Sequence, residues 1–384
     1  MTEQFLQKLR CPIDNAILDL VVFESEPCFQ NERHFIRIKN GVLINKNGSY
    51  IYPIQNFVPV LLIFETNFHN KFRLKFKSEL VLYNEYTWPE KKCEPGEKFI
   101  QNSFTDEWNL TQGDQLSFQR DENDLILLNQ EVWLKWIKND KEDIETLLNV
   151  GCGIGQETMA LQKVTKAKEI VAIDLNFAVL SAGERYKENS AINFVVCSLF
   201  HPPFIKESFD LVYSQGVLHH TYSTYKAFIS IAEFVKKEKY LFIWVYGLED
   251  HLCFINDKFN SPGSFVKNFI LVFNWYLEAI LRPLLSRAPK IIRDVLIYTL
   301  SLILHPLFKM RVIHKDLWKL ENTQHNLRDT FTPIYAFRHS VNEVFEWYEN
   351  NNFKVIDFQS PKAHRINFKG KRIHGIGLTG KKLN

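Results

Sequence analysis

The sequence predicts an α/β protein whose centre is a doubly wound sheet with helices on both faces. Strand-like and helix-like runs alternate between residues 146 and 247, which is typical of βαβ units in a parallel sheet. A glycine-rich turn, Gly151 to Gly155, joins the first of these strands to the first helix. Asp174 ends the next strand. A glycine turn followed by a carboxylate predicts a site for a nucleotide-like ligand.

A small β-rich unit is expected over residues 1–64. Its short strand-like runs are separated by Asn, Gly and Pro, and they are AILDLVVF, HFIRIKNGVLI and VPVLLIF. Residues 65–120 are charged and irregular, so a connecting segment is expected there. A helix follows, near residues 124–140.

The alternating region supplies most of the expected sheet. Its strand runs are TLLNVG, EIVAIDL, INFVVCSL, FDLVYSQG and KYLFIWVYG. Its helix runs are QETMALQKVTKA, FAVLSAGERYKEN and STYKAFISIAEFVKK. The last of these helices is expected over residues 223–237.

The pattern changes near residue 255, where a helical insertion is expected up to residue 320. The next run, SVNEVFEWYENNN, predicts a helix with a capping box from Ser340 to Glu343. Two strand runs, FKVIDFQ and HGIGLTG, then close the chain. We expect one domain over residues 121–384, with the insertion inside it.

The turn LLNVGCGIGQET is built to let a ligand approach the backbone, because glycine adopts φ angles that other residues avoid. A dinucleotide site has the spacing G-x-G-x-x-G/A, whereas residue 156 is Gln and the glycines follow G-x-G-x-G. Asp174 stands about 20 residues further on, where a carboxylate is expected to hold ribose hydroxyls.

Three motifs, LLNVGCGIGQET, IVAIDLN and FDLVYSQGVLHHT, resemble in order and spacing a class I S-adenosylmethionine-dependent methyltransferase. The resemblance covers residues 120–250 and 321–384. It implies a Rossmann-like, seven-stranded sheet whose last strand is antiparallel, completed by the hairpin 353–382. It also implies methyl transfer as the reaction and S-adenosyl-L-methionine as the cofactor.

The cofactor-binding residues that the resemblance implies lie at the carboxyl ends of the expected strands: Asn149, Gly151, Cys152, Gly153, Gly155, Asp174, Leu175, Ser198, Leu199, Gln215 and Gly216. The glycine turn would pack against the methionine and ribose parts of the cofactor. Asp174 would accept hydrogen bonds from the ribose hydroxyls, and Leu175 would lie against the adenine. Residues 198–199 would border the adenine edge, and residues 215–216 would line the floor near the sulfonium.

Two of these positions depart from the family pattern. Asn149 stands where an acidic residue is common, and Ser198 stands where an aspartate commonly takes the adenine amine. The loop KKEKY also lacks the usual Pro-Gly-Gly turn. Each departure removes a hydrogen bond or turn geometry worth on the order of 1 kcal/mol, so weaker cofactor binding is expected. A Rossmann-like scaffold that binds no cofactor is the alternative.

Methyl transfer is an in-line displacement for which the protein mainly supplies positioning, worth roughly 7–11 kcal/mol. A hydroxyl acceptor also profits from a general base, and VLHHT places His219 and His220 directly beyond the fourth strand, where open sheets bind ligands. In one interpretation one histidine faces the pocket, and in the other both are structural. Tyr246 is a second pocket candidate, and Arg338 and His339 are weaker ones.

The N-terminal unit resembles the zinc-ribbon domain of the tRNA-methyltransferase activator type. The matching residues are Cys11, Pro12, Gly48, Tyr52, Pro53, Ile54 and Pro59. Asp14 replaces the second cysteine of that pattern, and the second cysteine pair falls on Ile44 and Asn47. One thiolate and one carboxylate cannot close a tetrahedral zinc site, so we expect the ribbon fold without its metal.

The insertion has nine Lys and Arg against three Asp and Glu between residues 264 and 319. Its helix runs are apolar nearly all round, which predicts burial in protein or in lipid. Three interpretations stay open. The insertion is a lid over an acceptor pocket, an oligomer interface, or a basic, apolar surface that docks peripherally on a membrane or a lipid-linked acceptor.

Composition narrows the class of protein. The net charge of +3 is too small to suggest a nucleic-acid partner. No apolar stretch reaches the roughly 17–25 residues of a membrane span, and the nearest, Val295 to Phe308, contains Pro306. Six cysteines without a close pair, behind a start that lacks an apolar run, predict a cytoplasmic location.

The first functional hypothesis is methyl transfer to a small-molecule or glycan-like acceptor at a hydroxyl oxygen. The second is an RNA- or protein-directed methyltransferase, or a partner subunit of one. It is less favoured because no basic stripe with interleaved aromatics lies outside the insertion. The third is a non-catalytic scaffold without cofactor.

Overall fold

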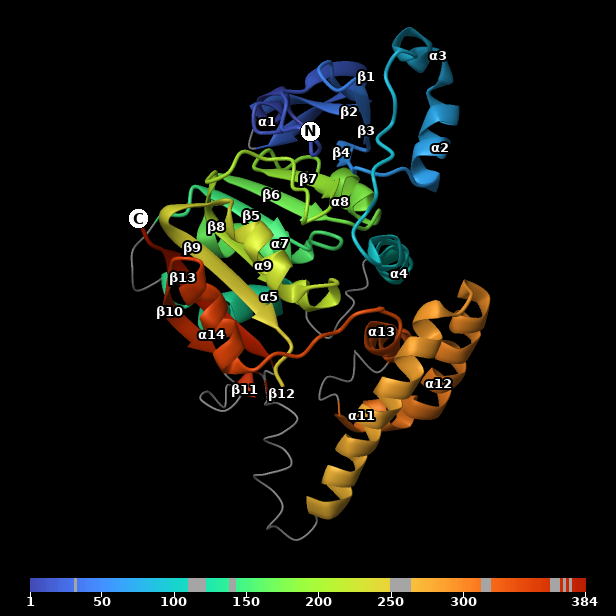
Figure 1. Cartoon of the computed structure of the whole chain (residues 1–384), viewed down its shortest axis with the longest axis vertical. Coiled ribbons are helices and arrows are strands. Elements are labelled where there is room, and N and C mark those ends of the chain that lie inside the picture. Colours follow the sequence, from blue (N-terminus) through green and yellow to red (C-terminus); the bar gives the residue numbers. More distant parts are fainter. Residues whose placement is uncertain are drawn as a thin grey trace.

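The computed structural model describes residues 1–30, 33–109, 122–137, 143–248, 264–311, 319–359, 367–368, 371–372 and 375–384. Its centre is one sheet of eleven strands in the order β1-β2-β3-β4-β7-β6-β5-β8-β9-β13-β10. In Figure 1 the sheet runs from the N-terminal strands at the top to the C-terminal hairpin, and the long helices α11 and α12 lie apart at the lower right.

Seven neighbouring strands form the doubly wound part of the sheet, and their bounds are β5 Thr146–Val150, β6 Glu169–Asp174, β7 Ile192–Cys197, β8 Phe209–Gln215, β9 Val235–Val245, β10 Phe353–Gln359 and β13 Ile376–Lys382. Strands β5 to β9 are parallel, whereas β13 is antiparallel to both β9 and β10. All six residues of β7 are buried, as expected for a strand covered on both faces.

Four N-terminal strands extend this sheet, and they are β1 Asp19–Gln30, β2 Arg33–Asn45, β3 Tyr50–Gln55 and β4 Val58–Leu61. They pair antiparallel with one another. The last one, β4, pairs parallel with β7, with Val60 opposite Val196. The prediction of a seven-stranded sheet is therefore wrong for the sheet as a whole, because the edge of β7 accepts the N-terminal unit.

Helices cover both faces of the doubly wound part, and their bounds are α5 Glu122–Leu128, α7 Gln156–Thr165, α8 Val179–Arg185, α9 Thr224–Ala232 and α14 Val341–Asn350. Side chains alternate between the two faces along each strand. Thus Leu148 packs in one core with Phe228 of α9 and Val344 of α14. Leu147 packs in the other core with Leu161 of α7 and Val179 of α8.

The connecting segment is more helical than the sequence predicted. It contains α2 Asn67–Lys75, α3 Lys77–Leu80, a 3-10 turn at Val81–Tyr83 and α4 Glu97–Asn109. The helix expected near 124–140 begins as α5 and continues as a π-helical turn, Asn129–Trp133. Residues 138–142 lie outside the described residues.

Two further predictions need correction. The helix expected over 223–237 ends at Ala232, because Val235 is fully buried and opens β9 opposite Phe209. Ser340 caps α14 by accepting from the Glu343 N–H. The Glu343 carboxylate accepts a hydrogen bond from His339 Nδ1, 2.9 Å away, in place of the second bond of the predicted capping box.

The insertion forms long helices, α11 Ser264–Arg287 and α12 Lys290–Arg311, followed by α13 Leu320–Phe331. Residues 255–263 and 312–318 of the expected insertion lie outside the described residues. Pro283 and Pro306 stand inside the two long helices. Among the described helices, none is both long and apolar enough to cross a membrane. The short elements α1 Glu3–Leu6, β11 Asn367–Phe368 and β12 Lys371–Arg372 complete the chain.

Arg37 of β2 joins the N-terminal unit to the doubly wound part. Its side chain is almost fully buried, and its Nη2 donates to the carbonyl of Asn189 at 2.5 Å and to that of Ile192 at 2.9 Å. Burial lowers the pKa of Arg37 to about 10, so the guanidinium stays charged at neutral pH.

We expect Arg37→Ala to lower the free energy of unfolding by about 2–4 kcal/mol. The substitution removes charged hydrogen bonds and leaves two buried carbonyls without their donor. Denaturant unfolding measures the change. Arg10→Ala is the matched control, since Arg10 donates to the nearby carbonyls of Gln7 and Leu9. Equal stability of the two variants would contradict this account of the junction.

Candidate functional site

The glycine turn between β5 and α7 has the geometry that the sequence predicted. Gly151 has a φ of +81°, a left-handed conformation that favours glycine. A Cβ atom at this position would lie 2.0 Å from Cγ2 of Val217, so no larger residue fits. The Gly151 and Cys152 N–H groups donate to the Ile173 carbonyl at the end of β6. The turn is therefore held close to the ends of two neighbouring strands.

A cavity of about 140 Å³ opens at the carboxyl ends of β5, β6 and β8. The sequence-predicted residues that line it are Gly151, Asp174, Leu175, Leu199, Gln215, Gly216 and His220. Parallel sheets present their ligand sites at this edge.

The other predicted residues support the site from outside the lining, and they are Asn149, Cys152, Gly153, Gly155, Ser198 and His219. Asn149 is buried, and its Nδ2 donates to Oγ1 of Thr158 at 2.9 Å. This bond fastens β5 to α7. It gives Asn149 a structural partner where an acidic residue was expected.

Asp174 ties the second strand to the glycine turn. Its Oδ2 accepts from the Gly153 N–H at 2.8 Å, and its Oδ1 accepts from the Asn176 N–H at 3.0 Å. Burial raises the pKa of Asp174, and these hydrogen bonds act in the opposite direction. The carboxylate of Asp174 also lines the cavity.

Helix α4 closes the cavity from a part of the chain that the sequence indicated only as a connecting segment. Its lining residues, Glu97, Ile100, Phe104 and Trp108, recur at helical spacing on one face. The helix is fastened to the strand ends, because Gln101 Nε2 donates to the Leu175 carbonyl at 2.9 Å. The spacing of three and four residues between these side chains is typical of one face of a helix, and the sequence analysis did not use it.

Glu97 brings a carboxyl group to the place where Ser198 departs from the family pattern. Its Oε1 accepts from the Ser198 hydroxyl, and its Oε2 accepts from the Glu94 N–H at 2.9 Å. Glu97 is almost fully buried at the cavity wall, and burial raises its pKa. A carboxyl group from α4 thus stands beside a strand end that lacks its own.

The volume of the cavity is below the roughly 300–1,000 Å³ of common ligand pockets. The cause is the closeness of α4, since the Trp108 ring lies 2.8 Å from the position of a Cβ on Gly153. The donor and acceptor groups fit a ribose and an adenine.

His220 is the histidine of the pair that reaches the cavity. Its Nδ1 lies 2.8 Å from the Tyr335 carbonyl, which can only accept, so Nδ1 carries the proton. Its Nε2 faces Asp329, with 4.0 Å between Nε2 and Oδ1. Burial lowers the pKa of His220, while Asp329 acts against this shift. The neutral ring therefore has its free nitrogen on the side of a carboxylate.

His219 is fully buried beside the cavity and does not line it. Its ring stacks on Tyr246 with 3.8 Å between centroids, and neither ring nitrogen has a hydrogen-bond partner among the described residues. Burial lowers its pKa well below the ordinary value. The Tyr246 hydroxyl donates to Oδ2 of Asp329 at 3.3 Å.

The two weaker candidates have structural partners. Arg338 pairs with Glu278 of α11 at 2.8 Å. His339 is buried between Oγ1 of Thr224 and the Glu343 carboxylate, each at 2.9 Å. Neither lines the cavity.

The N-terminal unit places Cys11 against Tyr52, with 3.1 Å between sulfur and hydroxyl oxygen. Burial raises the pKa of the Cys11 thiol. Both oxygens of Asp14 accept from Nδ2 of Asn45. Within the described ranges, no three His, Cys, Asp or Glu side chains form a group that could hold a metal ion.

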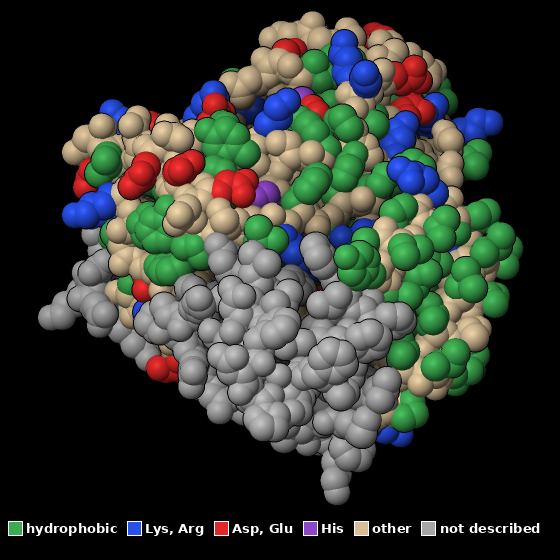
Figure 2. All heavy atoms as spheres, turned by 60° about the horizontal axis from the view of Figure 1, so that its bottom comes forward, with side chains coloured by type: hydrophobic (Ala, Val, Ile, Leu, Met, Phe, Trp, Pro, Cys, Tyr) green, Lys and Arg blue, Asp and Glu red, His purple; other side chains and the backbone are tan. Residues whose placement is uncertain are grey.

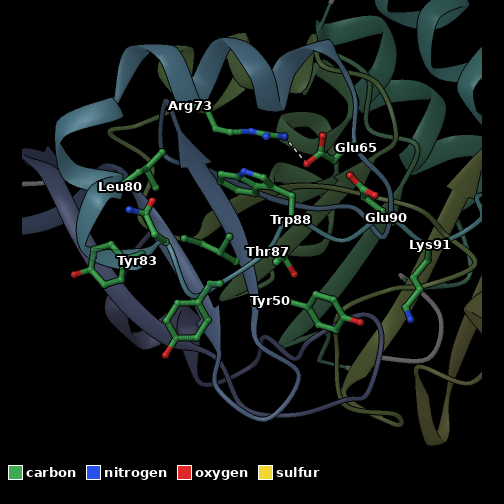
Figure 3. A pocket seen from close by; sticks show the side chains of 12 residues that line it. Tyr50, Glu65, Arg73, Leu80, Tyr83, Thr87, Trp88, Glu90 and Lys91 are labelled. Carbon is green, nitrogen blue, oxygen red and sulfur yellow. Dashed lines mark hydrogen bonds and ion pairs between the residues drawn. The ribbon is translucent and has the colours of Figure 1, made fainter.

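A larger hollow, of about 580 Å³, lies away from the strand ends, between β3 and the segment 65–91. Figure 3 shows Arg73 extending over the Trp88 ring toward Glu65, with Tyr50 and Tyr83 on the opposite side. The Arg73 guanidinium carbon lies 5.6 Å from the Trp88 ring centroid. None of the residues predicted to bind cofactor or catalyse transfer lines this hollow.

Residues 148–243 match the family model described as "Methyltransferase domain". This range contains the glycine turn, Asp174 and both histidines. No curated protein matches the chain.

Several solved structures are similar to the chain at low identity. One is the complex of the Haloferax volcanii Trm112 methyltransferase activator with a methyltransferase (12% identity, 69% of this chain and 96% of that chain, TM-score 0.38). Another is magnesium protoporphyrin IX methyltransferase from Synechocystis with bound S-adenosylhomocysteine (11%, 74% and 99%, TM-score 0.43). A third is 1,6-didemethyltoxoflavin-N1-methyltransferase from Burkholderia thailandensis (12%, 78% and 95%, TM-score 0.42). Similarities this remote carry no information about the acceptor.

The family match and the geometry of the strand ends define the class of enzyme. The chain is an S-adenosylmethionine-dependent methyltransferase with a Rossmann-like methyltransferase domain. Its cofactor is S-adenosyl-L-methionine.

We expect Glu97→Gln to weaken the binding of S-adenosylmethionine about 10- to 150-fold, the effect of losing a hydrogen bond to a charged group. Isothermal titration calorimetry measures the dissociation constant. Glu90→Gln is the matched control, because Glu90 is exposed on the same connecting segment and does not line the cavity. Unchanged affinity in Glu97→Gln would remove Glu97 from the cofactor site.

Proposed function

We propose that the enzyme methylates a hydroxyl oxygen of a small-molecule or glycan-like acceptor. The observation that carries this proposal is His220. It combines a proton on Nδ1, a free Nε2 and a lowered pKa at the wall of the cofactor cavity. A hydroxyl must lose its proton when it is methylated, and a neutral imidazole is suited to accept it.

The cofactor supplies an activated methyl group on a sulfonium. The chain's own residues hold the reactants in line and receive the proton. His220 takes the hydroxyl proton on Nε2 as the oxygen–carbon bond forms. The Tyr335 carbonyl keeps Nδ1 oriented, and the Asp329 carboxylate, 4.0 Å from Nε2, stabilises the imidazolium that results.

The proposal extends to the cofactor-binding residues. Asp174 holds the ribose hydroxyls, and the glycine turn packs against the methionine and ribose parts. Gln215 and Gly216 form the floor beside the reactive centre. The support for these assignments is that Gly151, Asp174 and residues 215–216 line the same cavity.

We further propose the domain division 1–64, 65–120 and 121–384, with the insertion 255–320 inside the last domain. Residues 1–64 are a degenerate, metal-free ribbon of the tRNA-methyltransferase activator type. The support is the contact of Cys11 with Tyr52 and the bonds of Asp14 to Asn45, which occupy both side chains. The proposed location is cytoplasmic, which the free thiols of Cys28 and Cys152 support.

We expect Asp174→Ala to weaken S-adenosylmethionine binding at least tenfold, because two ribose hydroxyls lose a charged acceptor. Calorimetry with purified protein measures it. Asp19→Ala, at an exposed position paired with Lys46, is expected to bind as the wild type does. Absence of binding by well-folded wild-type protein would sink the proposed chemistry.

We expect His220→Gln to lower methyl transfer by about 10²–10⁴-fold while S-adenosylmethionine affinity changes little. Transfer of a labelled methyl group to a panel of hydroxylated and glycan acceptors measures the rate. His34→Gln, at an exposed position in β2, is the control. A His220→Gln enzyme as fast as the wild type would show that the histidine is structural.

The pH dependence should follow from the lowered pKa of His220. The base must be neutral, so transfer is expected to persist below pH 6.5, the ordinary value for histidine, and to fall as the pH drops through the lowered pKa. The acidic limb of the kcat/KM profile measures this. A limb above pH 6.5 would contradict the lowered pKa of His220.

A further inference from the structure

Helices α11 and α12 present an apolar face to solvent. On α11, Ile280 and Leu284 are 60% and 64% exposed and stand four residues apart. On α12, Ile291, Val295 and Leu302 are 79%, 59% and 50% exposed and follow one another at helical spacing. Figure 2 shows hydrophobic side chains gathered over the side of the molecule where these helices lie. We call this surface the α11–α12 face.

The opposite side of the two helices is already packed. Leu285 of α11 and Ile297 of α12 form a small core with Leu327 and Phe331 of α13. The helices are therefore apolar both where they meet α13 and where they meet water. Contiguous apolar surface of this kind marks an interaction site in a folded protein.

The charge of the segment that carries this face favours one kind of partner. The whole chain has 47 Lys and Arg against 44 Asp and Glu, whereas residues 264–319 alone have nine against three. The remainder of the chain therefore has 38 against 41. The positive charge of the protein is concentrated in the segment that carries the apolar face. Two such segments from two copies would repel each other, whereas an anionic surface would attract each one.

We propose that the α11–α12 face docks peripherally on an anionic lipid surface. Its apolar side chains enter the boundary between headgroups and acyl chains, and the exposed Arg287 and Lys290 meet the lipid charge. Tyr276 and Tyr298 are 61% and 51% exposed on the same two helices. Tyrosine rings are enriched at the level of the headgroups, which fits this placement.

The docked helices are fastened to the residues around His220. Glu278 of α11 pairs with Arg338, and Arg282 donates to the carbonyls of Thr330 and Ala336. These residues flank Tyr335, whose carbonyl orients His220. The lipid surface and the catalytic histidine are thus joined through one short segment. Resting on the proposed function, the acceptor is a hydroxylated molecule anchored in, or linked to, lipid.

Vesicle co-sedimentation of the full chain tests the docking. One vesicle preparation is phosphatidylcholine alone, and the other contains phosphatidylglycerol in addition. The wild type is expected to sediment with the anionic vesicles, and less so as salt is raised. The double variant Ile291→Asp/Ile303→Asp is expected to lose at least tenfold in binding, since Ile303 is also 65% exposed.

Leu74→Asp is the matched control, because Leu74 is 78% exposed on α2 and lies outside the α11–α12 face. It is expected to sediment as the wild type does, and thermal unfolding checks that all variants are folded. Wild-type protein that stays in solution with anionic vesicles would overturn the proposal, as would undiminished binding by the double variant. A wild-type dimer that the double variant splits, without vesicle binding, would assign the face to a second copy.

The same proteins separate this proposal from the proposed function. Vesicle binding does not depend on catalysis, and S-adenosylmethionine calorimetry does not depend on vesicles. Docking with no cofactor binding would leave the surface intact and remove the methyl-transfer chemistry. Cofactor binding by a wild type that does not dock would remove only the lipid surface.

Discussion

The hydrogen bond from the Gly153 N–H to Asp174 is the constraint on which the cofactor site depends. It joins the end of β6 to the turn that follows β5, so one carboxylate both stabilises a left-handed backbone and faces the cavity. The Ile173 carbonyl adds two bonds to the same turn. Val217 packs against Gly151 and Trp108 packs against Gly153, and a side chain on either glycine would collide with them. The same turn therefore contacts both Val217 and helix α4.

The two residues that depart from the family pattern, Asn149 and Ser198, each form a side-chain hydrogen bond with another part of the chain. Ser198 is too short to reach a ligand as an aspartate would, and Glu97 of α4 stands beside it with a buried carboxyl group. Asn149 bonds to Thr158 and becomes part of the β5–α7 junction. The acidic group that is missing at the end of β7 thus has a counterpart on a helix outside the sheet.

The insertion is bonded to the segment 330–338 beside the cavity. Arg282 and Glu278 of α11 hold the backbone near Tyr335, which in turn sets the tautomer of His220. A helical pair that carries the protein's excess positive charge is thereby connected to the segment that contacts His220. The N-terminal unit is joined just as firmly at the other end, where β4 extends the sheet beside β7 and Arg37 is buried.

The sequence by itself determined the doubly wound sheet, the glycine turn, Asp174 and the histidine pair, because strand and helix periods and left-handed turns are local properties of the chain. Seven of the cofactor and catalytic candidates named from the sequence line the cavity in the folded structure. Only the tertiary structure decided that β4 joins β7, that Glu97 stands beside Ser198 and that His220 rather than His219 reaches the cavity. Edge pairing and the approach of α4 are contacts between residues far apart in sequence, which no local period encodes. The orientation of the neighbouring histidines depends on two distant residues. Tyr335 is 115 residues from His220, and Tyr246 is 27 residues from His219.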